Sequence, residues 1–285
     1  MKVSLVAAVS ATLASLASAQ NSTGYAAGLL QALQSANLTT LASLATANAA
    51  TLLPLLQSGN HTLFAPSDSA FAALTENVTS NESLVAATLM YHIYYGAYAP
   101  SNLSANHTIA RSALNSSTYV NLPSNASQVA VFTSGGAGQN NQSATVVQAT
   151  SNVTSTAYTK YENLDVYIID EVLSIPGNLT AVATEAGLTS LTGALTQYAS
   201  SAIPALTSAK GITVFAPVNS AFESAASLIG TLNQTAIADV LLNHVINGTV
   251  VYSPLVANGS NATSAGGATL SFSTNSTGVF VKSGN

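Results

Sequence analysis

The sequence contains very little charge. Its 285 residues include 5 lysine or arginine and 10 aspartate or glutamate side chains, which is 5% of the chain, whereas typical soluble domains are roughly 25% charged. So few basic groups cannot form the phosphate-neutralising surface that nucleic-acid binding requires, and this class of partner is excluded. The composition leaves open how a chain with 48% hydrophobic residues stays in solution.

Cysteine is absent altogether. No disulfide can therefore staple a small extracellular domain, so each domain has to bury a sufficient apolar core, which favours units well above about 80 residues. The absence also excludes thiol nucleophiles and thiolate metal sites. Beyond residue 20 no run reaches the roughly 18 consecutive apolar residues that a membrane-spanning helix needs, so we expect no transmembrane helix.

Residues 1–19 have the pattern of a secretory signal peptide. Lys2 precedes an apolar stretch, and the small residues at 17–19 provide a cleavage site. The alternative is a buried alanine-rich helix of the mature domain. The first interpretation predicts a secreted protein that begins at Gln20 and is located outside the cell, at the cell surface or in the cell wall.

Asn-x-Ser/Thr sequons, the acceptor sites for N-linked glycans, are frequent in the remaining chain. In a secreted protein they are available to the glycosylation machinery, and we expect glycans to replace charge as the solubilising layer. The seventeen candidate asparagines are Asn21, Asn37, Asn60, Asn77, Asn81, Asn102, Asn106, Asn115, Asn125, Asn141, Asn152, Asn178, Asn233, Asn247, Asn258, Asn261 and Asn275.

Four blocks of the sequence recur in the same order at a nearly constant offset. The repeated blocks are 36–41 with 186–191, 62–71 with 213–222, 89–92 with 241–244 and, more loosely, 131–135 with 280–284. Self-similarity of this kind predicts two tandem copies of one domain.

Local patterns predict the elements of the first copy. Leucines spaced by three and four residues across 30–44 predict helices with a break at Asn37, a residue type that tolerates the left-handed conformation at a helix end. Residues 62–66 predict a short strand that ends at a proline, after which Ser67 or Asp68 can cap a helix.

Local patterns also predict elements in the later part of the first copy. Residues 83–91 predict a helix, and the β-prone residues 92–95 predict a strand directly after it. Residues 166–169 are nearly all apolar, which indicates a buried strand.

At these blocks the chain resembles the fasciclin-domain family. The resemblance rests on Thr62–Phe71, the Tyr91-His92 pair and Val166–Leu173, and on 213–222 and the residues from Val245 in the second copy. It implies an α+β fold with two tandem domains, each made of helices packed around a wedge-shaped β-sandwich. It also implies an extracellular protein that acts in adhesion between cells or to matrix.

The resemblance sets the expected domain limits. We predict fasciclin-like domain 1 over 20–175 and fasciclin-like domain 2 over 178–285. The counterpart of Leu173 would lie about 151 residues further on, beyond residue 285, so the second domain is expected to lack its closing strand and to expose an unpaired sheet edge. A truncated gene model and a natural fragment completed by a partner strand both fit this pattern.

The histidines are the candidate functional groups. His61 and His107 lie within sequons and are expected at the surface. His92 and His244 occupy equivalent positions in the two copies, and each is interpreted either as a core histidine bonded to backbone or as a binding residue. By the resemblance, Tyr91 and His92 belong to an adhesion surface, whereas the second copy has asparagine in place of the tyrosine.

No pattern of residues predicts catalysis. The sequence has no Gly-x-Ser-x-Gly elbow, no acidic pair that recurs in both copies and no histidines spaced as metal ligands on one helix. We therefore expect no catalytic residue, no metal and no cofactor.

The predicted function is non-catalytic adhesion, or association with the cell surface, extracellular matrix or cell wall, through weak multivalent contacts. The expected partner is an extracellular or cell-surface protein or glycan, a second copy included. The alternatives are a carbohydrate- or lipid-binding module and a secreted hydrolase with His92 or His244 as its base. No hydrophobic tail precedes residue 285, so we expect no lipid anchor in this sequence.

Overall fold

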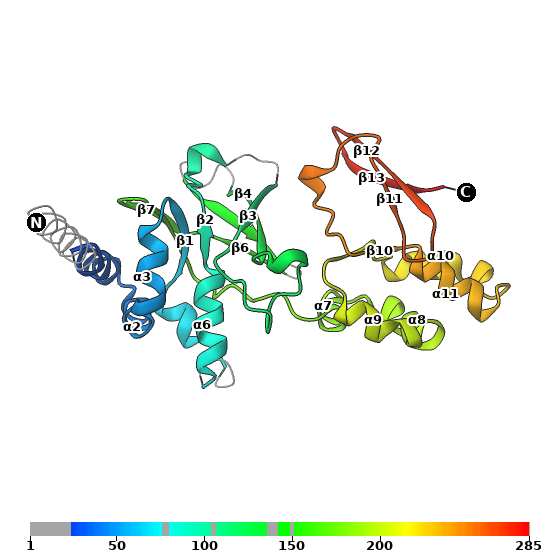
Figure 1. The fold of residues 1–285 in the computed structure, drawn as a ribbon, viewed down its shortest axis with the longest axis horizontal. Helices are drawn as coiled ribbons and strands as arrows, with labels where there is room; N and C mark the ends of the chain where they lie inside the picture. The colour runs from blue at the N-terminus through cyan, green and yellow to red at the C-terminus, as the bar shows by residue number, and fades with distance from the viewer. Residues whose placement is uncertain (1–23, 76–79, 104–106, 136–141, 149–150, 285) are drawn as a thin grey trace, which may run out of the picture. The chain divides into compact units, whose positions relative to one another are not determined.

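A computed structural model describes residues 24–75, 80–103, 107–135, 142–148 and 151–284, so the predicted signal peptide lies outside the described residues. The chain divides into two compact units. One comprises the described residues of 1–103, 134–145 and 153–173, and the other those of 104–133, 146–152 and 174–285. Helices and several sheets make up the chain (Figure 1), which confirms the predicted α+β class.

The first helices of the chain follow the leucine pattern. Residues 24–35 are helical, and the chain then passes through Asn37, whose φ of 57° is left-handed as predicted. The N–H of Leu38 donates to the carbonyl of Leu33 at 2.9 Å, the bond that closes a Schellman cap. The helices that follow are α2 (Thr39–Ala47), α3 (Ala49–Gln57), α4 (Asp68–Ala72) and α6 (Glu82–Tyr91).

One four-stranded sheet forms the centre of the first unit. Its order is β2 (Ile93–Tyr95), β1 (His61–Pro66), β8 (Leu164–Ile169) and β7 (Ala157–Tyr161). β1 and β8 are parallel, and the other pairs are antiparallel. Every residue of β1 is buried, since a strand covers each of its edges and side chains cover both faces.

Aromatic side chains fill one face of this sheet. The ring of Phe64 stacks on Tyr167 at a centroid distance of 5.1 Å and meets Tyr94 edge-on at 5.8 Å. Such pairs are worth about 0.5–1.5 kcal/mol each beyond the area they bury. The packing explains why the repeated block places a phenylalanine at this point of the strand.

A second four-stranded sheet has the order β3 (Thr108–Arg111), β4 (Val129–Ser134), β5 (Ala144–Val147) and β6 (Asn152–Thr154). Phe132 on β4 and Val146 on β5 are fully buried. The short 3-10 helices η1 (Pro100–Asn102) and η2 (Pro123–Asn125) each begin with a proline, whose fixed φ suits the first helical position.

The second unit repeats the helical part of the first. Its helices are α7 (Leu179–Glu185), α8 (Thr189–Tyr198), α9 (Ile203–Ser208), α10 (Asn219–Ile229) and α11 (Gln234–Leu242), with the short η4 (Ser200–Ala202) and η5 (Ser253–Leu255). Gly187 has a φ of 69° and occupies the position that Asn37 occupies in the first copy. The buried hydrophobic cluster between these helices is formed by Leu191, Ala199, Ile237 and Leu241.

The sheets formed by residues 212–283 are smaller than the two four-stranded sheets. β9 (Ile212–Val214) and β10 (Val245–Asn247) form a two-stranded antiparallel sheet. β11 (Asn261–Thr263), β12 (Thr269–Asn275) and β13 (Gly278–Ser283) form a three-stranded one. Among the described residues β9 pairs only with β10, whereas its counterpart β1 has a strand on each side.

The predicted equivalence of 131–135 with 280–284 is wrong. β4 carries the buried Phe132 and pairs with β3, and the strand that pairs with β11 in the same way is β12, which carries the buried Phe272. Phe280 lies instead on β13 and is 48% exposed. The segment between β3 and β4 spans 112–128, whereas the segment between β11 and β12 spans only 264–268. Because these lengths differ, the nearly constant offset matched β4 with β13, one strand beyond its structural counterpart β12.

Candidate functional site

His92 lies at the end of α6, inside the core of the first unit. Its Nδ1 is 2.7 Å from the carbonyl oxygen of Thr88, and its Nε2 accepts a hydrogen bond from the N–H of Leu173 at 2.9 Å. Because a carbonyl only accepts, the proton of the neutral ring belongs on Nδ1. Burial, with 1% of the residue exposed, lowers the pKa of His92 to about 4, against a smaller opposite effect of the bond to Thr88.

Tyr91 is also buried, with 3% of its surface exposed. Burial raises the pKa of its hydroxyl well above the ordinary value, and its ring lies 6.2 Å from that of Tyr94. Neither Tyr91 nor His92 presents its side chain to a partner, so any part that they take in binding would be indirect. Their contacts match the core-histidine interpretation.

His244 keeps half of the arrangement of His92. Its Nδ1 is 2.8 Å from the carbonyl oxygen of Val240, at the same spacing along the helix. Its Nε2 has no hydrogen-bond partner among the described residues, and the side chain is half-buried. The neighbouring Asn243, in the place of Tyr91, accepts a bond from the hydroxyl of Ser264 at 2.7 Å.

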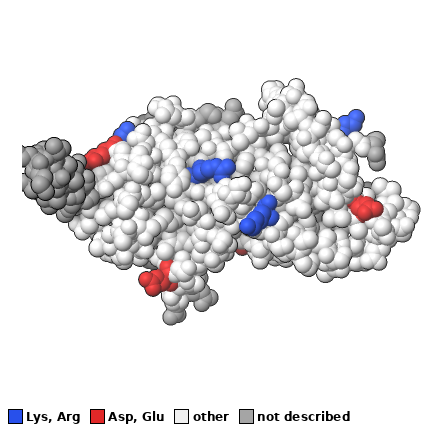
Figure 2. Space-filling model, in the orientation of Figure 1, with Lys and Arg blue, Asp and Glu red and all other residues white. Residues whose placement is uncertain are grey.

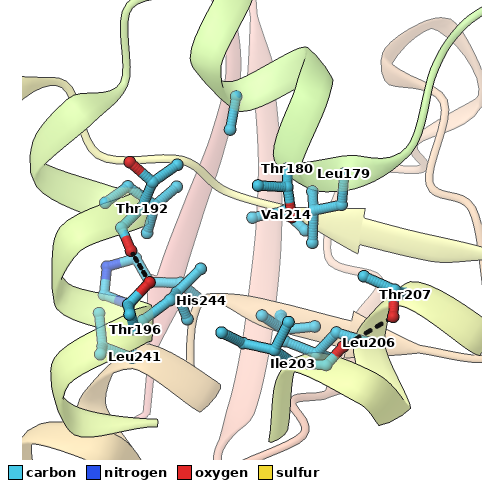
Figure 3. A pocket seen from close by; sticks show the side chains of 14 residues that line it. Leu179, Thr180, Thr192, Thr196, Ile203, Leu206, Thr207, Val214, Leu241 and His244 are labelled. Carbon is cyan, nitrogen blue, oxygen red and sulfur yellow. Dashed lines mark hydrogen bonds between the residues drawn. The ribbon is translucent and has the colours of Figure 1, made fainter. Parts of the chain in front are cut away.

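The ring of His244 borders a small apolar cavity within the second unit (Figure 3). Leu179, Ile203, Leu206 and Val214 line it, and its volume is about 60 Å³. Pockets for small-molecule ligands measure roughly 300–1,000 Å³, so this cavity accommodates a side chain rather than a metabolite.

A larger apolar groove occurs in each unit at equivalent positions. In the first unit it has a volume of about 330 Å³ and is lined by Leu44, Phe71 and Leu89 among others. In the second unit Phe222 and Leu241 line a groove of about 470 Å³. Phe71 and Phe222 are equivalent residues of the blocks repeated at 62–71 and 213–222, but the sequence alone did not indicate a groove beside them.

Asp68, the first residue of α4, forms hydrogen bonds to the start of α2. Its carboxylate accepts hydrogen bonds from the hydroxyl of Thr39 at 2.6 Å and from the N–H of Thr40 at 2.8 Å, at the start of α2. These bonds, chiefly the one from Thr39, lower the pKa of the carboxyl. In the second unit Asn219 does the same, since it accepts from the N–H of Ser190 at 3.0 Å.

His61 and His107, the two histidines within sequons, differ in their exposure to solvent. His107 is exposed, as predicted. The prediction for His61 is wrong, because this residue begins β1 and is 1% exposed. Its Nδ1 lies 3.0 Å from the carbonyl oxygen of Gly59, and burial lowers its pKa.

The described residues do not assemble the parts of a hydrolase. Nucleophilic catalysis needs a base hydrogen-bonded to a nucleophile and oriented by a third group. His92 is bonded to backbone on both ring nitrogens, and His244 is bonded only to a carbonyl. The described part of the chain also contains no group of three or more His, Cys, Asp or Glu side chains that could hold a metal ion.

The sequon asparagines that the structure describes lie at the surface. Asn21, Asn77, Asn106 and Asn141 fall outside the described residues, and all of the other thirteen are exposed. Asn81, Asn178 and Asn233 cap helices through Oδ1, to which an N–H of the first turn donates. Capping through oxygen leaves Nδ2, the atom that carries the sugar, available for modification.

Figure 2 shows few charged side chains on one face of the molecule, most of them surrounded by uncharged residues, which agrees with the 5% charged content. Among the described residues no single helix has the length and apolar character to cross a membrane, although α2 and α3, bent by 99° relative to each other, meet these criteria together.

Comparison with known proteins identifies similar sequences and a similar solved structure. The sequence model of the fasciclin domain matches residues 28–176 and again 186–284. A fasciclin-like arabinogalactan protein of Arthroderma benhamiae is 26% identical over 209 residues, which is 70% of this chain but 47% of that protein, so the chain spans about half of its length. A solved FAS1 domain pair from the insect cell adhesion molecule Fasciclin I aligns with 87% of this chain and 88% of its own, at 14% identity and a TM-score of 0.43.

Proposed function

Because the chain belongs to the fasciclin-domain family, in two tandem copies, we propose that it is a secreted, N-glycosylated, non-catalytic protein of cell adhesion or of cell-surface, matrix or cell-wall association. The family match carries the proposal. The name of the fungal relative, a fasciclin-like arabinogalactan protein, supports it. We place the domains at 20–175 and 178–285, after a signal peptide over 1–19.

The exposed sequons support the glycan part of the proposal. With 5% charged residues, the protein has few ionic groups to hold water at its surface, and glycans on exposed asparagines would supply that hydration. Enzymatic removal of N-glycans from the secreted protein is expected to lower its solubility and to promote association. A deglycosylated protein that stays equally soluble and monodisperse would contradict this part.

Adhesion is tested with the purified glycoprotein on a surface. Wells coated with it are expected to retain cells or cell-wall fragments in a saturable manner, and soluble protein should compete. An unrelated charge-poor glycoprotein serves as the control. Retention no higher than on the control would refute adhesion, while leaving secretion and glycosylation to be judged separately.

The repeated groove supports a second candidate, the binding of an apolar ligand such as a lipid chain. Both grooves fall within the volume range of ligand pockets, and their walls are mainly apolar, which favours lipid over carbohydrate. A fluorescent fatty acid is the probe. Replacing Leu228, which lines the second groove, by serine should weaken binding, whereas Leu255→Ser, at an equally exposed position outside the groove, should not.

A further inference from the structure

The grooves of the two units occupy equivalent positions but differ in the size of the residues that line them. Leu44 on α2 lines the first groove, and its counterpart on α8 is Ala194, which lines the second. Beside Ala194, Gly193 takes the place of Ser43, and a Cβ added at Gly193 would meet no atom within 4 Å. These smaller residues explain why the second groove measures about 470 Å³ and the first about 330 Å³.

The lining of the second groove also carries less charge and polarity than that of the first. Asp68 contributes a carboxylate to the first groove, and the residue at the equivalent position is Asn219. Thr88 of the first groove is replaced by Val240, which is 47% exposed, and Leu228, 63% exposed, adds another apolar side chain. None of the described residues that line the second groove is Lys, Arg, Asp or Glu, so the groove suits an uncharged apolar ligand.

Hydrogen bonds at the helix ends hold the frame of this groove. The Nδ2 group of Asn219 donates to the carbonyl of Gly187 at 3.0 Å, and its Oδ1 accepts from the N–H of Ser190 at 3.0 Å. The start of α10 is thereby fixed to the start of α8. Oδ1 of Asn233 caps α11 by accepting from the N–H of Ala236 at 2.9 Å. A frame that is set before the ligand binds spares the free energy of ordering it on binding.

The strands that follow these helices do not line the groove. In the first unit, where β8 and the residues up to Leu173 are in place, the equivalent groove is lined entirely by residues within 40–89. The second groove is likewise lined by residues within 190–244. The repeat therefore indicates that the groove belongs to α8, α10, α11 and the residues at their ends.

The chain around the second groove lacks glycan acceptor sites. No sequon occurs between Asn178 and Asn233, whereas the corresponding part of the first copy contains Asn37, Asn60 and Asn77. N-linked glycans of the kind proposed above would not be attached within this stretch. The second groove therefore stays accessible to a large apolar ligand in the glycoprotein.

We propose that the groove of the second unit binds a sterol, with the ring system against the apolar wall and the hydroxyl at Gln197 and Tyr198. These two residues line the groove in the last turn of α8 and offer an amide and a phenol, which hydrogen-bond a hydroxyl but cannot neutralise a carboxylate or a phosphate. A fused ring system needs a wider groove than a single acyl chain, so Gly193 and Ala194 favour a sterol over a fatty acid. This assignment rests on the second candidate function, ligand binding in the grooves, and names the ligand class and the unit.

The test uses dehydroergosterol, a fluorescent sterol, added to the full secreted chain. Because His244 also lines the groove, the measurements are made at pH 7.5, where a free imidazole is uncharged. We expect saturable binding of one sterol per chain, with slower hydrogen exchange in α8, α10 and α11 and unchanged exchange in α2 and α6. Cholesterol should displace the probe, and oleate should do so at least about tenfold more weakly, because its carboxylate would meet no lysine or arginine among the described lining residues.

Gly193→Leu is the variant that should block the groove. The leucine would fill the space beside Gly193, and leucine is a better helix former than glycine, so the melting temperature should not fall. Sterol binding should weaken about tenfold or more. Gly24→Leu is the matched control, because Gly24 is also helical and exposed, and a Cβ added there meets no atom within 4 Å. It should leave sterol binding unchanged.

Several results would overturn the proposal. Equal affinity for sterol and oleate would refute the choice of a sterol while leaving lipid binding in the groove intact. Sterol binding that Gly193→Leu does not weaken, or that slows exchange in α2 and α6 instead, would place the site elsewhere. Absence of binding by both sterol and oleate, with unchanged exchange in α8, would refute ligand binding itself, and a dimer in sedimentation that Leu228→Ser dissociates would make a second copy the occupant. The comparison of ligands on the unmutated chain does not depend on whether the variants fold.

Discussion

Acid should destabilise the first unit through His92. The folded unit holds this ring neutral at a pKa of about 4, whereas in the unfolded chain the pKa returns to about 6.5. Between these values the unfolded chain binds more protons than the folded one, so the free energy of unfolding falls as the pH falls from about 6.5 to about 4. The difference between the two pKa values corresponds to about 3 kcal/mol, a large share of the 5–15 kcal/mol typical of a domain.

The structural cause is specific to the ring. Protonation would place an N–H on Nε2, where the N–H of Leu173 already donates, and the resulting charge would be buried. His92→Gln cannot take up this proton. At pH 7 the variant should be less stable by about 1–3 kcal/mol, because it disturbs a buried hydrogen bond, but its stability should change less between pH 7 and pH 4 than that of the wild type.

Hydrogen exchange of β8 at several pH values measures the effect, since it reports the opening free energy of this unit alone. His107→Gln is the matched control, because that histidine is exposed. Other groups, His61 among them, titrate in both proteins and cancel in the comparison. Identical pH dependence of the wild type and His92→Gln would refute the reasoning.

Three further predictions concern the helix ends. Asn37→Gly should leave thermal stability unchanged within a few tenths of a kcal/mol, whereas Asn37→Val should lower it by about 1–2 kcal/mol, because a β-branched residue resists the left-handed conformation; a neutral valine variant would contradict this. Ser67→Ala, which removes the cap of α4, should lower the free energy of unfolding by about 1 kcal/mol in urea denaturation. Val218→Ser should raise it by a similar amount by capping α10. A more stable Ser67→Ala variant or a less stable Val218→Ser variant would contradict this assignment of the caps. Asp68→Ala should destabilise the start of α2, whereas Asp68→Asn should be better tolerated, because Asn219 makes the equivalent bond in the second copy. Because the pKa of Asp68 is lowered in the folded protein, its contribution to stability should be lost as the pH falls through that pKa. Equal melting temperatures of the two variants at neutral pH would contradict this prediction.

Local chemistry explains why much of the fold was predictable. The helix end at Asn37, the strand that ends at Pro66 and the cap at Ser67 each depend on one residue and its immediate neighbours. The helix over 82–91 and the strand over 93–95 also lie within a residue of the predicted limits. In these cases periodicity and turn chemistry are sufficient.

Long-range contacts account for the failures. Asp68 caps a helix that begins 29 residues earlier in the chain, and no local pattern indicates such a bond. The burial of His61 follows from the two strands on either side of β1, one of which comes about a hundred residues later. The slip between β12 and β13 arose because neighbouring strands share one alternating pattern, so similarity of sequence did not identify the strand.

The claim of a glycan-coated extracellular protein is tested most directly by the intact mass of the chain produced in a eukaryotic host. The account predicts that the protein is recovered from the medium, begins at Gln20 and loses mass in steps when N-glycans are removed at the exposed sequons. Recovery from the cell interior, with Met1 retained and no N-linked glycan, would contradict it.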